Sequence, residues 1–153
     1  MHLGLCDMEI IQELTAADIR KAGTVFESAA AVALDGNLEE EMLRDATEIL
    51  SDKMLFYDPV SANIAHRAEA CIGRFHSIKP NLIEAEVLSG MKIETDEELR
   101  NAARYFLDKG VKNVYITLNC DGVYFKNKEK EGFIRPPKSI KIESATGAGD
   151  AFS

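Results

Sequence analysis

Residues 29–59, AAAVALDGNLEEEMLRDATEILSDKMLFYDP, decide the fold, because two short apolar runs flank a helix-forming segment. The runs, residues 29–34 and 53–57, end in the turn signals DG and DP, and short apolar runs bounded by turns are typical of buried strands. Between them, Asn37 with Glu40 three residues later predicts a helix N-cap and its capping-box partner. The stretch therefore predicts a strand, a helix and a second strand.

The same alternation continues on both sides of this stretch. Helices are expected at residues 10–28, 61–75, 81–88 and 95–109, and strands at residues 76–78, 111–118, 122–126, 132–135 and 140–142. Thr95 with Glu98 predicts a second capping box, while Gly90 and Gly110 are expected to end their helices. Alternating strands and helices predict an α/β fold with three layers, a mainly parallel sheet with helices on both faces.

Polar residues follow several of the predicted strands. Asp35, Asp58, Asn81 and Asn119 each come directly after a strand or its short turn, as does the glycine-rich turn near the C-terminus. The carboxyl ends of parallel strands meet at one edge of a sheet, which is where such proteins bind ligands. These side chains are therefore expected to share one rim.

The composition excludes several classes of function. The 153 residues suit a single domain, and the net charge of −8 argues against nucleic acid as a partner. The three cysteines are far apart and form no metal or redox motif. No apolar run approaches the roughly 20 residues that span a bilayer, and no signal peptide is recognised, so a membrane is not expected and the location is expected to be cytoplasmic.

The last ten residues, SATGAGDAFS, carry the strongest chemical signal. Small residues at Gly147, Ala148 and Gly149 allow their backbone N–H groups to approach an anion closely, the more so at a helix N-terminus. Asp150 follows directly, where a carboxylate is suited to accept a proton from an attacking hydroxyl. The alternative is a flexible glycine turn with Asp150 in the first turn of a helix.

Two further segments have both a structural and a functional interpretation. Asn81 and Glu84 form a capping box, and the same two side chains are suited to organise water and Mg²⁺ around nucleotide phosphates. Thr117 and Gly122 lie around the end of a predicted strand, where the alternative to a nucleotide site is an ordinary hairpin entry.

Taken in order, these motifs resemble the ribokinase-like, or PfkB-type, carbohydrate kinase family. TGAGD at residues 146–150 is similar to the C-terminal signature of the family, Asn81 and Glu84 to its N-x-x-E motif, and Thr117 to Gly122 to its nucleotide strand. Stretches such as ALDGNL and DPVSA look most like the pseudouridine kinase branch. The resemblance extends over essentially the whole chain and implies a ribokinase-like fold.

The resemblance also implies roles for these residues. Asp150 would be the catalytic base, and residues 147–149 would form the anion hole for the transferring phosphoryl group. Asn81 and Glu84 would serve phosphate and Mg²⁺, with Glu84 the metal-associated residue, and Thr117 and Gly122 would line the ATP site. Ser144 and Ala145 replace the usual Asp-Thr, which puts a monovalent-cation site in doubt.

The resemblance implies further segments at both ends, so residues 1–153 are interpreted as one partial kinase domain that stops just after the GAGD motif. The expected reaction is ATP-dependent phosphoryl transfer to a hydroxyl of a sugar or nucleoside, possible acceptors being pseudouridine or a free sugar such as ribose or fructose. The remaining alternative is an inactive nucleotide-binding or structural remnant. The isolated chain is expected to self-associate and to show no kinase activity.

Overall fold

A computed structural model describes residues 9–137, and its centre is a six-stranded sheet whose strands lie side by side in chain order. The strands are β1 (Ala31–Asp35), β2 (Met54–Asp58), β3 (Ser77–Ile78), β4 (Asn113–Thr117), β5 (Val123–Asn127) and β6 (Glu131–Ile134). β1 to β4 are parallel, and β5 and β6 complete the sheet as an antiparallel hairpin. The predicted parallel sheet and its closing hairpin are confirmed, while the strand expected at residues 140–142 lies outside the described residues.

Seven α-helices accompany these strands in the described part of the chain. They are α1 (Glu9–Gln12), α2 (Ala16–Lys21), α3 (Gly23–Ser28), α4 (Glu40–Ile49), α5 (Ala62–Ala65), α6 (Leu82–Ser89) and α7 (Asp96–Lys109), with 3-10 turns η1 (His66–Ala68), η2 (Ile72–Arg74) and η3 (Asn119–Asp121). None of the helices within residues 9–137 is long and apolar enough to cross a membrane.

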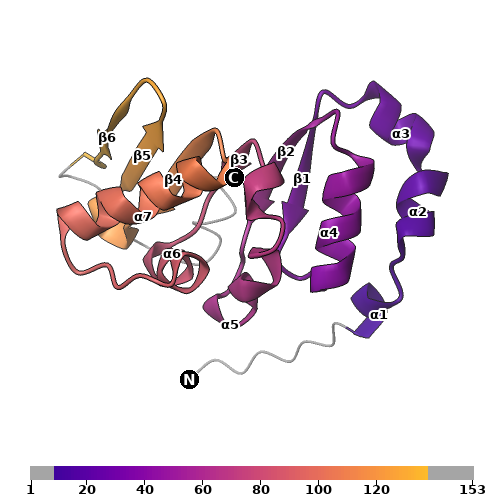
Figure 1. Cartoon of the computed structure of the whole chain (residues 1–153), viewed down its shortest axis with the longest axis horizontal. Helices are drawn as coiled ribbons and strands as arrows, with labels where there is room; N and C mark the ends of the chain where they lie inside the picture. The colour runs from indigo at the N-terminus through magenta and orange to yellow at the C-terminus, as the bar shows by residue number, and fades with distance from the viewer. Residues whose placement is uncertain (1–8, 138–153) are drawn as a thin grey trace.

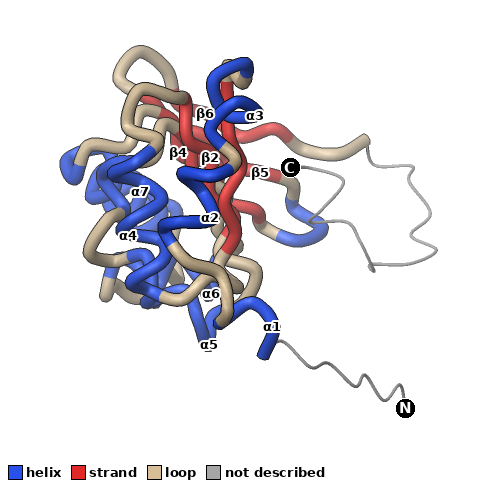
Figure 2. Tube along the Cα trace, turned by 90° about the vertical axis from the view of Figure 1, so that its right-hand side faces the viewer, coloured by secondary structure: helices blue, strands red, loops and turns tan. Residues whose placement is uncertain are grey.

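The helices α4 to α7 lie together on one face of the sheet (Figures 1 and 2). Connections between neighbouring parallel strands are right-handed, and here the strand order advances in one direction without reversing. Each connection from β1 to β4 therefore brings its helix to the same side. Helices were expected on both faces of the sheet. Within residues 9–137 the helices α4 to α7 cover one face only, because the strand order does not reverse within these residues.

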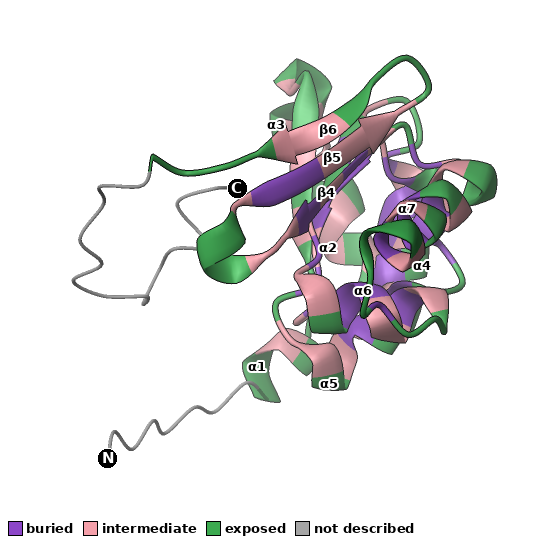
Figure 3. Cartoon of the chain, turned by 90° about the vertical axis from the view of Figure 1, so that its left-hand side faces the viewer, coloured by how far each residue is buried: buried purple, intermediate pink, exposed green. Residues whose placement is uncertain are grey.

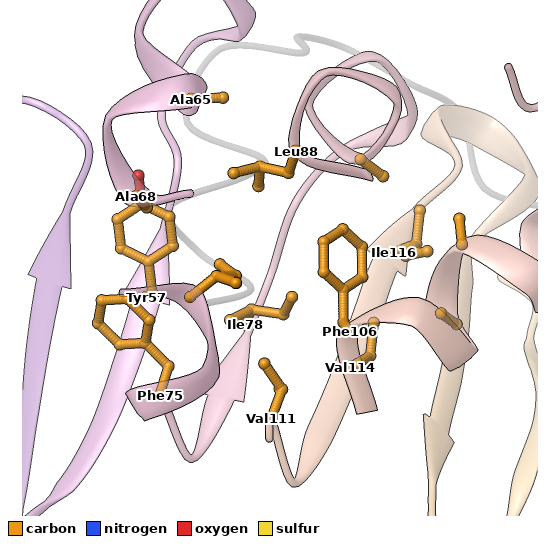
Figure 4. Close-up of a cluster of buried hydrophobic side chains, with 14 of the residues drawn as sticks. Tyr57, Ala65, Ala68, Phe75, Ile78, Leu88, Phe106, Val111, Val114 and Ile116 are labelled. Atoms are coloured by element: carbon orange, nitrogen blue, oxygen red, sulfur yellow. The ribbon is translucent and has the colours of Figure 1, made fainter. Parts of the chain in front are cut away.

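The hydrophobic core fills the space between this helical layer and the sheet (Figures 3 and 4). Strand residues that point toward the helices are buried, among them Tyr57 in β2 and Ile116 in β4. Tyr57 stacks on Phe75 with ring centroids 4.7 Å apart, and Phe106 from α7 lies near the centre of the cluster. Full burial of such a side chain stabilises the fold by about 1.5–3 kcal/mol.

Several of the alternate strand positions, on the opposite face of the sheet, are exposed, although Ser77 and Val123 on the same face are buried. Met54 and Phe56 in β2 are 44% and 40% exposed, and Ile134 in β6 is 57% exposed. Strand residues alternate between the two faces, so these side chains all point away from the helices. We call this the open face of the sheet, meaning that no α-helix of the described residues covers it.

The N-terminal region differs from the single helix expected at residues 10–28. The chain forms three short helices there, and α2 begins after Thr15, whose backbone N–H donates to Asp18 Oδ2 at 3.0 Å. A threonine followed three residues later by an acidic residue is a helix-start signal, and here it ends one helix and begins another. Near Ala22, a second break separates α2 from α3.

The start of α4 also differs from the prediction. The N-cap is Glu39, not Asn37, and the helix begins at Glu40. The Asp35 carboxylate accepts the backbone N–H of Asn37 at 2.8 Å, which holds Asn37 in a turn after β1. This turn delays the helix by two residues.

The segment expected to be one helix at residues 61–75 is instead α5 followed by two 3-10 turns. Gly73 explains part of this, because a Cβ atom there would lie 2.0 Å from the backbone oxygen of Lys109. The tightened backbone lets the segment contact the end of α7 directly. The boundaries of α6 and α7 follow the prediction, with capping boxes at both N-termini and with Gly90 and Gly110 at the C-terminal ends.

Candidate active site

The carboxyl edge of the parallel strands gathers the polar residues that the sequence singled out. Asp35 ends β1 and Asp58 ends β2, and the two are paired in register. Lys79 follows β3, and its backbone N–H donates to the oxygen of Tyr57 at 2.9 Å. The expected common rim is therefore present for the residues after β1, β2 and β3.

Asn81 and Glu84 form the capping box of α6. The backbone N–H of Glu84 donates to Asn81 Oδ1 at 3.0 Å, and the backbone N–H of Asn81 donates to Glu84 Oε2 at 2.8 Å. Reciprocal bonds of this kind satisfy two otherwise unpaired donors at a helix start. The structural interpretation of this motif is confirmed.

The Glu84 carboxylate is unusually well buried for a charged group, with 2% of the residue exposed. Burial raises the pKa of Glu84 above its ordinary value, and the hydrogen bond from Asn81 opposes that shift. The charges of Asp58 and Lys79 also act on it, Asp58 raising and Lys79 lowering the same pKa. The three side chains therefore form one electrostatic group at the carboxyl edge.

The donor set at this edge consists of oxygen atoms, which Mg²⁺ prefers. Among the residues that the structure describes, no group of three or more His, Cys, Asp or Glu side chains gathers to hold a metal. Proteins commonly bind Mg²⁺ through one or two carboxylates, with water and phosphate oxygens completing the shell. One oxygen of Glu84 is engaged by Asn81, so the residue fits this mode through its other oxygen.

Thr117, at the end of β4, lies directly beside Asn81. The two residues form an isolated parallel bridge, and the backbone N–H of Thr117 donates to the oxygen of Pro80 at 3.0 Å. Asn81 and Thr117 are 36 residues apart in the sequence, and both were predicted to belong to a nucleotide site. The fold brings these two predicted residues into contact.

Gly122 lies between η3 and β5, directly before the first residue of β5 and at the same end of β4 as Thr117. Its oxygen accepts the backbone N–H of Leu118 at 2.8 Å, and its φ is 96°, a conformation that favours glycine. A Cβ atom there would lie 2.0 Å from the Ile134 backbone oxygen, so only glycine lets the two strands meet. Asn119 also has a positive φ, 53°, which asparagine tolerates better than most residues.

The four residues Gly147, Ala148, Gly149 and Asp150 lie outside the described residues, as do Ser144 and Ala145. Their predicted roles stay predictions. Among the described residues, Asn81, Glu84, Thr117 and Gly122 all lie around the carboxyl ends of β3 and β4.

Lys79 was not among the residues predicted for the site. Lys79 Nζ lies 2.8 Å from Asp58 Oδ2, and its side chain is only 14% exposed. The available signal was its position directly after a strand on the same rim as Asp58. A lysine in that position is easily overlooked, because most lysines are solvated at the surface.

The family is decided by a comparison with known protein families. Residues 9–153 match the family described as pfkB family carbohydrate kinase. The chain belongs to this family. The resemblance inferred from the motifs is thereby confirmed, and kinases are the class of enzyme to which its relatives belong.

Relatives among characterised proteins are consistent with this assignment. The pseudouridine kinase of Escherichia coli K12 is 30% identical over 152 residues, which cover 99% of this chain and 49% of that protein. The ribokinase of Staphylococcus aureus strain COL is 43% identical over 75 residues, covering 49% of this chain and 24% of that protein. This pfkB-family chain thus spans about half the length of the pseudouridine kinase, and its match to the ribokinase covers about a quarter of that protein.

Solved structures show that the fold is ribokinase-like. A Clostridium perfringens protein described as a sugar kinase superposes with a TM-score of 0.88 at 34% identity, over 97% of this chain and 47% of that one. The Arabidopsis thaliana ribokinase, solved with ribose and ATP, superposes with a TM-score of 0.75 at 21% identity, over 91% and 44% of the two chains. The pfkB-family chain therefore has the predicted α/β fold.

Proposed function

We propose that the chain is part of an ATP-dependent kinase for a hydroxyl of a sugar or nucleoside, with pseudouridine the preferred acceptor. The observation that carries this proposal is the buried Glu84 carboxylate, held by Asn81 beside Thr117 in a pfkB-family chain. Carboxyl edges of this kind are where α/β proteins bind their ligands. The preference for pseudouridine is supported by the 30% identity to the E. coli pseudouridine kinase.

The proposed roles follow the motifs. Asp150 accepts the proton of the acceptor hydroxyl while that oxygen bonds to the γ-phosphorus and the bond to the ADP oxygen breaks. Backbone N–H groups of residues 147–149 hold the transferring phosphoryl group. Thr117 and Gly122 line the nucleotide site, and Asn81 and Glu84 organise its phosphate end. Mg²⁺, when bound there, would neutralise phosphate charge.

A free sugar is the second candidate acceptor. The specific observation in its favour is the 43% identity to the S. aureus ribokinase over 75 residues. Ribose therefore takes precedence over fructose as the alternative. A third outcome, an inactive remnant of a kinase, remains part of the test below.

Location and partners are proposed on the same footing. We expect a cytoplasmic protein with small-molecule substrates, because the relatives include a pseudouridine kinase and a ribokinase and the net charge of −8 disfavours nucleic acid. Neither a membrane nor a monovalent cation is part of the proposal.

A phosphoryl-transfer assay on protein that contains residues 1–153, with pseudouridine, ribose and fructose as acceptors, tests the function. Asp150→Asn keeps the size of the side chain and removes the base, so turnover is expected to fall by about 10²–10⁴-fold while ATP binding persists. Wild-type turnover in the variant would contradict the role of Asp150. Absence of turnover and of ATP binding in the wild-type protein would favour the inactive remnant.

A further inference from the structure

Basic side chains gather around the carboxylate of Glu131 where α7 packs beside β5 (Figure 1). Arg100 Nε on α7 lies 3.5 Å from Glu131 Oε1, and Lys126 on β5 forms an ion pair with Glu131 Oε2. The Tyr124 hydroxyl donates to Glu131 Oε2 at 3.1 Å. We call Arg100, Arg104, Tyr124, Lys126 and Glu131 the basic cluster.

Arg104 belongs to the basic cluster through its charge. It follows Arg100 by four residues on α7, and side chains with this spacing are neighbours on the surface of a helix. Burial raises the pKa of Tyr124, and the positive charges of Arg100 and Arg104 oppose that shift. Loss of solvent around Lys126 lowers the pKa of its ammonium group, and the charges of Arg104 and Arg100 lower it further. Both arginines therefore act on the same two side chains of β5.

The cations of the basic cluster outnumber the carboxylates that pair with them. Within residues 9–137, Glu131 is the only carboxylate within ion-pair distance of Arg100 or Lys126, and the exposed Arg104 has no ion-pair partner. Like charges one helical turn apart repel each other. An anion bound between them would relieve this repulsion.

Lys126 is the cation of the cluster that water reaches least. Its side chain is 14% exposed, whereas those of Arg100 and Glu131 are 44% and 40% exposed. Lys126 is paired in register with the buried Val114, so both side chains lie on the helical side of the sheet. Most lysines are instead solvated at the surface. The ammonium group is thus positioned beside α7 before any ligand arrives.

The basic cluster lies at the opposite end of β4 from the candidate active site. Lys126 is paired with Val114, near the start of β4, whereas Thr117, at the carboxyl end, is paired with Val123. The residues proposed to bind nucleotide and Mg²⁺ lie around that carboxyl end. A ligand held by the basic cluster therefore occupies a site separate from the proposed nucleotide site.

The chemistry of the cluster suits a phosphate group. A guanidinium group presents its N–H donors in a planar fork that matches phosphate oxygens, and lysine adds a point charge. Four residues of a helix span roughly 6 Å along its axis, so Arg100 and Arg104 suit one compact anionic group better than a long acidic segment. Glu131 holds Arg100 and Lys126 in place and competes with a ligand for them.

We propose that the basic cluster is an anion site that binds the phosphate group of a small molecule, with Arg100 and Arg104 as fork donors and Lys126 as the positioned charge. This inference does not rest on the proposed kinase function, because it uses none of the residues assigned to that function. The alternative is that Glu131 only ties the β5–β6 hairpin to α7, and that Arg104 is an ordinary solvated side chain.

NMR of the purified protein during titration with inorganic phosphate, at fixed pH and ionic strength, tests the site. The Nε–H resonances of Arg100 and Arg104 and the backbone N–H of Lys126 are expected to shift and to saturate, and they report this site separately from the nucleotide site. Pyrophosphate should act at lower concentrations because it carries more charge, and acetate only at higher ones. Absent or unsaturable shifts, or an equal response to acetate and phosphate, would overturn the inference.

Arg104→Met removes the fork and keeps an unbranched, helix-forming side chain. Phosphate binding is expected to weaken by about 10-fold to 100-fold, the range of a hydrogen bond to a charged group. Arg104→Lys should weaken it less, because the charge remains while the fork is lost. Equal phosphate affinity in wild type and Arg104→Met would overturn the inference.

Arg20→Met is the matched control. Arg20 lies on α2, is exposed and, like Arg104, has no ion-pair partner among residues 9–137. No charged residue stands three or four positions from it on either side. Its replacement should leave phosphate binding unchanged. An equal loss in Arg20→Met would show a general effect of net charge and overturn the assignment to the basic cluster.

Glu131→Gln gives a change of opposite sign. Glutamine can still accept the Tyr124 hydroxyl, whereas the competing negative charge is removed, so phosphate should bind a few-fold more tightly than to the wild type. A carboxylate that only ties the hairpin to α7 predicts no such gain. Unchanged or weaker phosphate binding in Glu131→Gln would contradict the competition and overturn the inference.

Discussion

At the scale of single residues, Glu84 has a structural and a proposed functional role that use different properties of the same side chain. Its Oε2 atom completes the capping box with Asn81, which requires only a hydrogen-bond acceptor. The proposed contribution to Mg²⁺ requires negative charge. Glutamine keeps the acceptor and removes the charge, so one substitution separates the two roles.

Glu84→Gln is expected to raise the Mg²⁺ concentration needed for half-maximal activity sharply, at an unchanged helix content. In a full-length enzyme that contains residues 1–153, the variant should be compared with wild type by a Mg²⁺ titration of the kinase assay and by circular dichroism. If the two titration curves coincide, capping alone is the better account of Glu84.

Gly36 shows how a single residue brings together two loops of the rim. A Cβ atom there would lie 2.1 Å from the backbone oxygen of Pro59, and the Gly36 N–H donates to the Asp58 oxygen at 2.8 Å. The loops after β1 and β2 can approach this closely only because the side chain is absent.

Gly36→Ala is expected to lower the free energy of unfolding by about 1–3 kcal/mol, since backbone must shift to admit the methyl group. Urea denaturation provides the measurement. Gly23→Ala is the control, because no atom lies within 4 Å of a Cβ placed there, and it should not be destabilising. Equal stability of the Gly36 variant and wild type would contradict the close contact.

At the scale of elements, α6 and α7 both begin with a capping box, but the glutamates of the two capping boxes differ in how far they are buried. Both have a capping-box glutamate, Glu84 in α6 and Glu98 in α7. Burial raises the pKa of Glu84, whereas the hydrogen bond from the backbone N–H of Glu94, with others from Thr95, lowers the pKa of the half-buried Glu98. The same sequence motif therefore responds to pH with opposite signs.

The sign of each pH effect follows from these shifts. A raised folded-state pKa means that Glu84 favours the folded protein below its ordinary pKa of 4.5, and this contribution is lost as the pH rises through the folded-state value. A lowered pKa means that Glu98 favours the folded protein above 4.5, and this contribution is lost as the pH falls.

The free energies of unfolding of Glu84→Gln and Glu98→Gln, measured by urea denaturation relative to wild type, are thus expected to change in opposite directions between pH 4 and pH 7 (~3 units, spanning ordinary carboxyl pKa values). Relative to wild type, the Glu84 variant should gain stability as the pH rises, and the Glu98 variant should lose it. Parallel pH profiles for the two variants would show that burial does not distinguish the two capping boxes.

At the scale of the whole molecule, we expect the open face of the sheet to promote self-association. Exposed apolar side chains on β2 and β6 lie on this face, and β1 is an edge strand of the sheet among the described residues. Large exposed apolar patches and unpaired strand edges both favour association with other chains. A second copy of the chain is the partner that we expect in a purified sample.

Self-association should appear in light scattering of the purified chain as a mass that rises with concentration. Phe56→Glu is expected to reduce it, because a charge then lies on the open face. Ile83→Glu is the matched control: Ile83 is 61% exposed but belongs to α6, on the helical side of the sheet. A monomeric wild-type chain, or equal effects of the two substitutions, would contradict this interface.

The sequence by itself determined the elements whose signals are local. The strands at β1, β2 and β4 and the capping boxes of α6 and α7 are specified by short apolar runs, turns and caps a few residues long, so their positions could be predicted. The pairs Asn81–Glu84 and Thr117–Gly122 were found for the same reason. Thr15 with Asp18 was a local signal too, although it was overlooked.

Only the tertiary structure decided what depends on residues distant in the chain. The Asn81–Thr117 bridge, the close approach of Gly36 to Pro59 and the Asp58–Lys79 ion pair each join different strands or loops. Apolar periodicity does not encode which face the helices cover, because that depends on strand order and the handedness of the connections. Likewise, the burial of Glu84 is a property of the packing around its carboxylate, which a local motif does not contain.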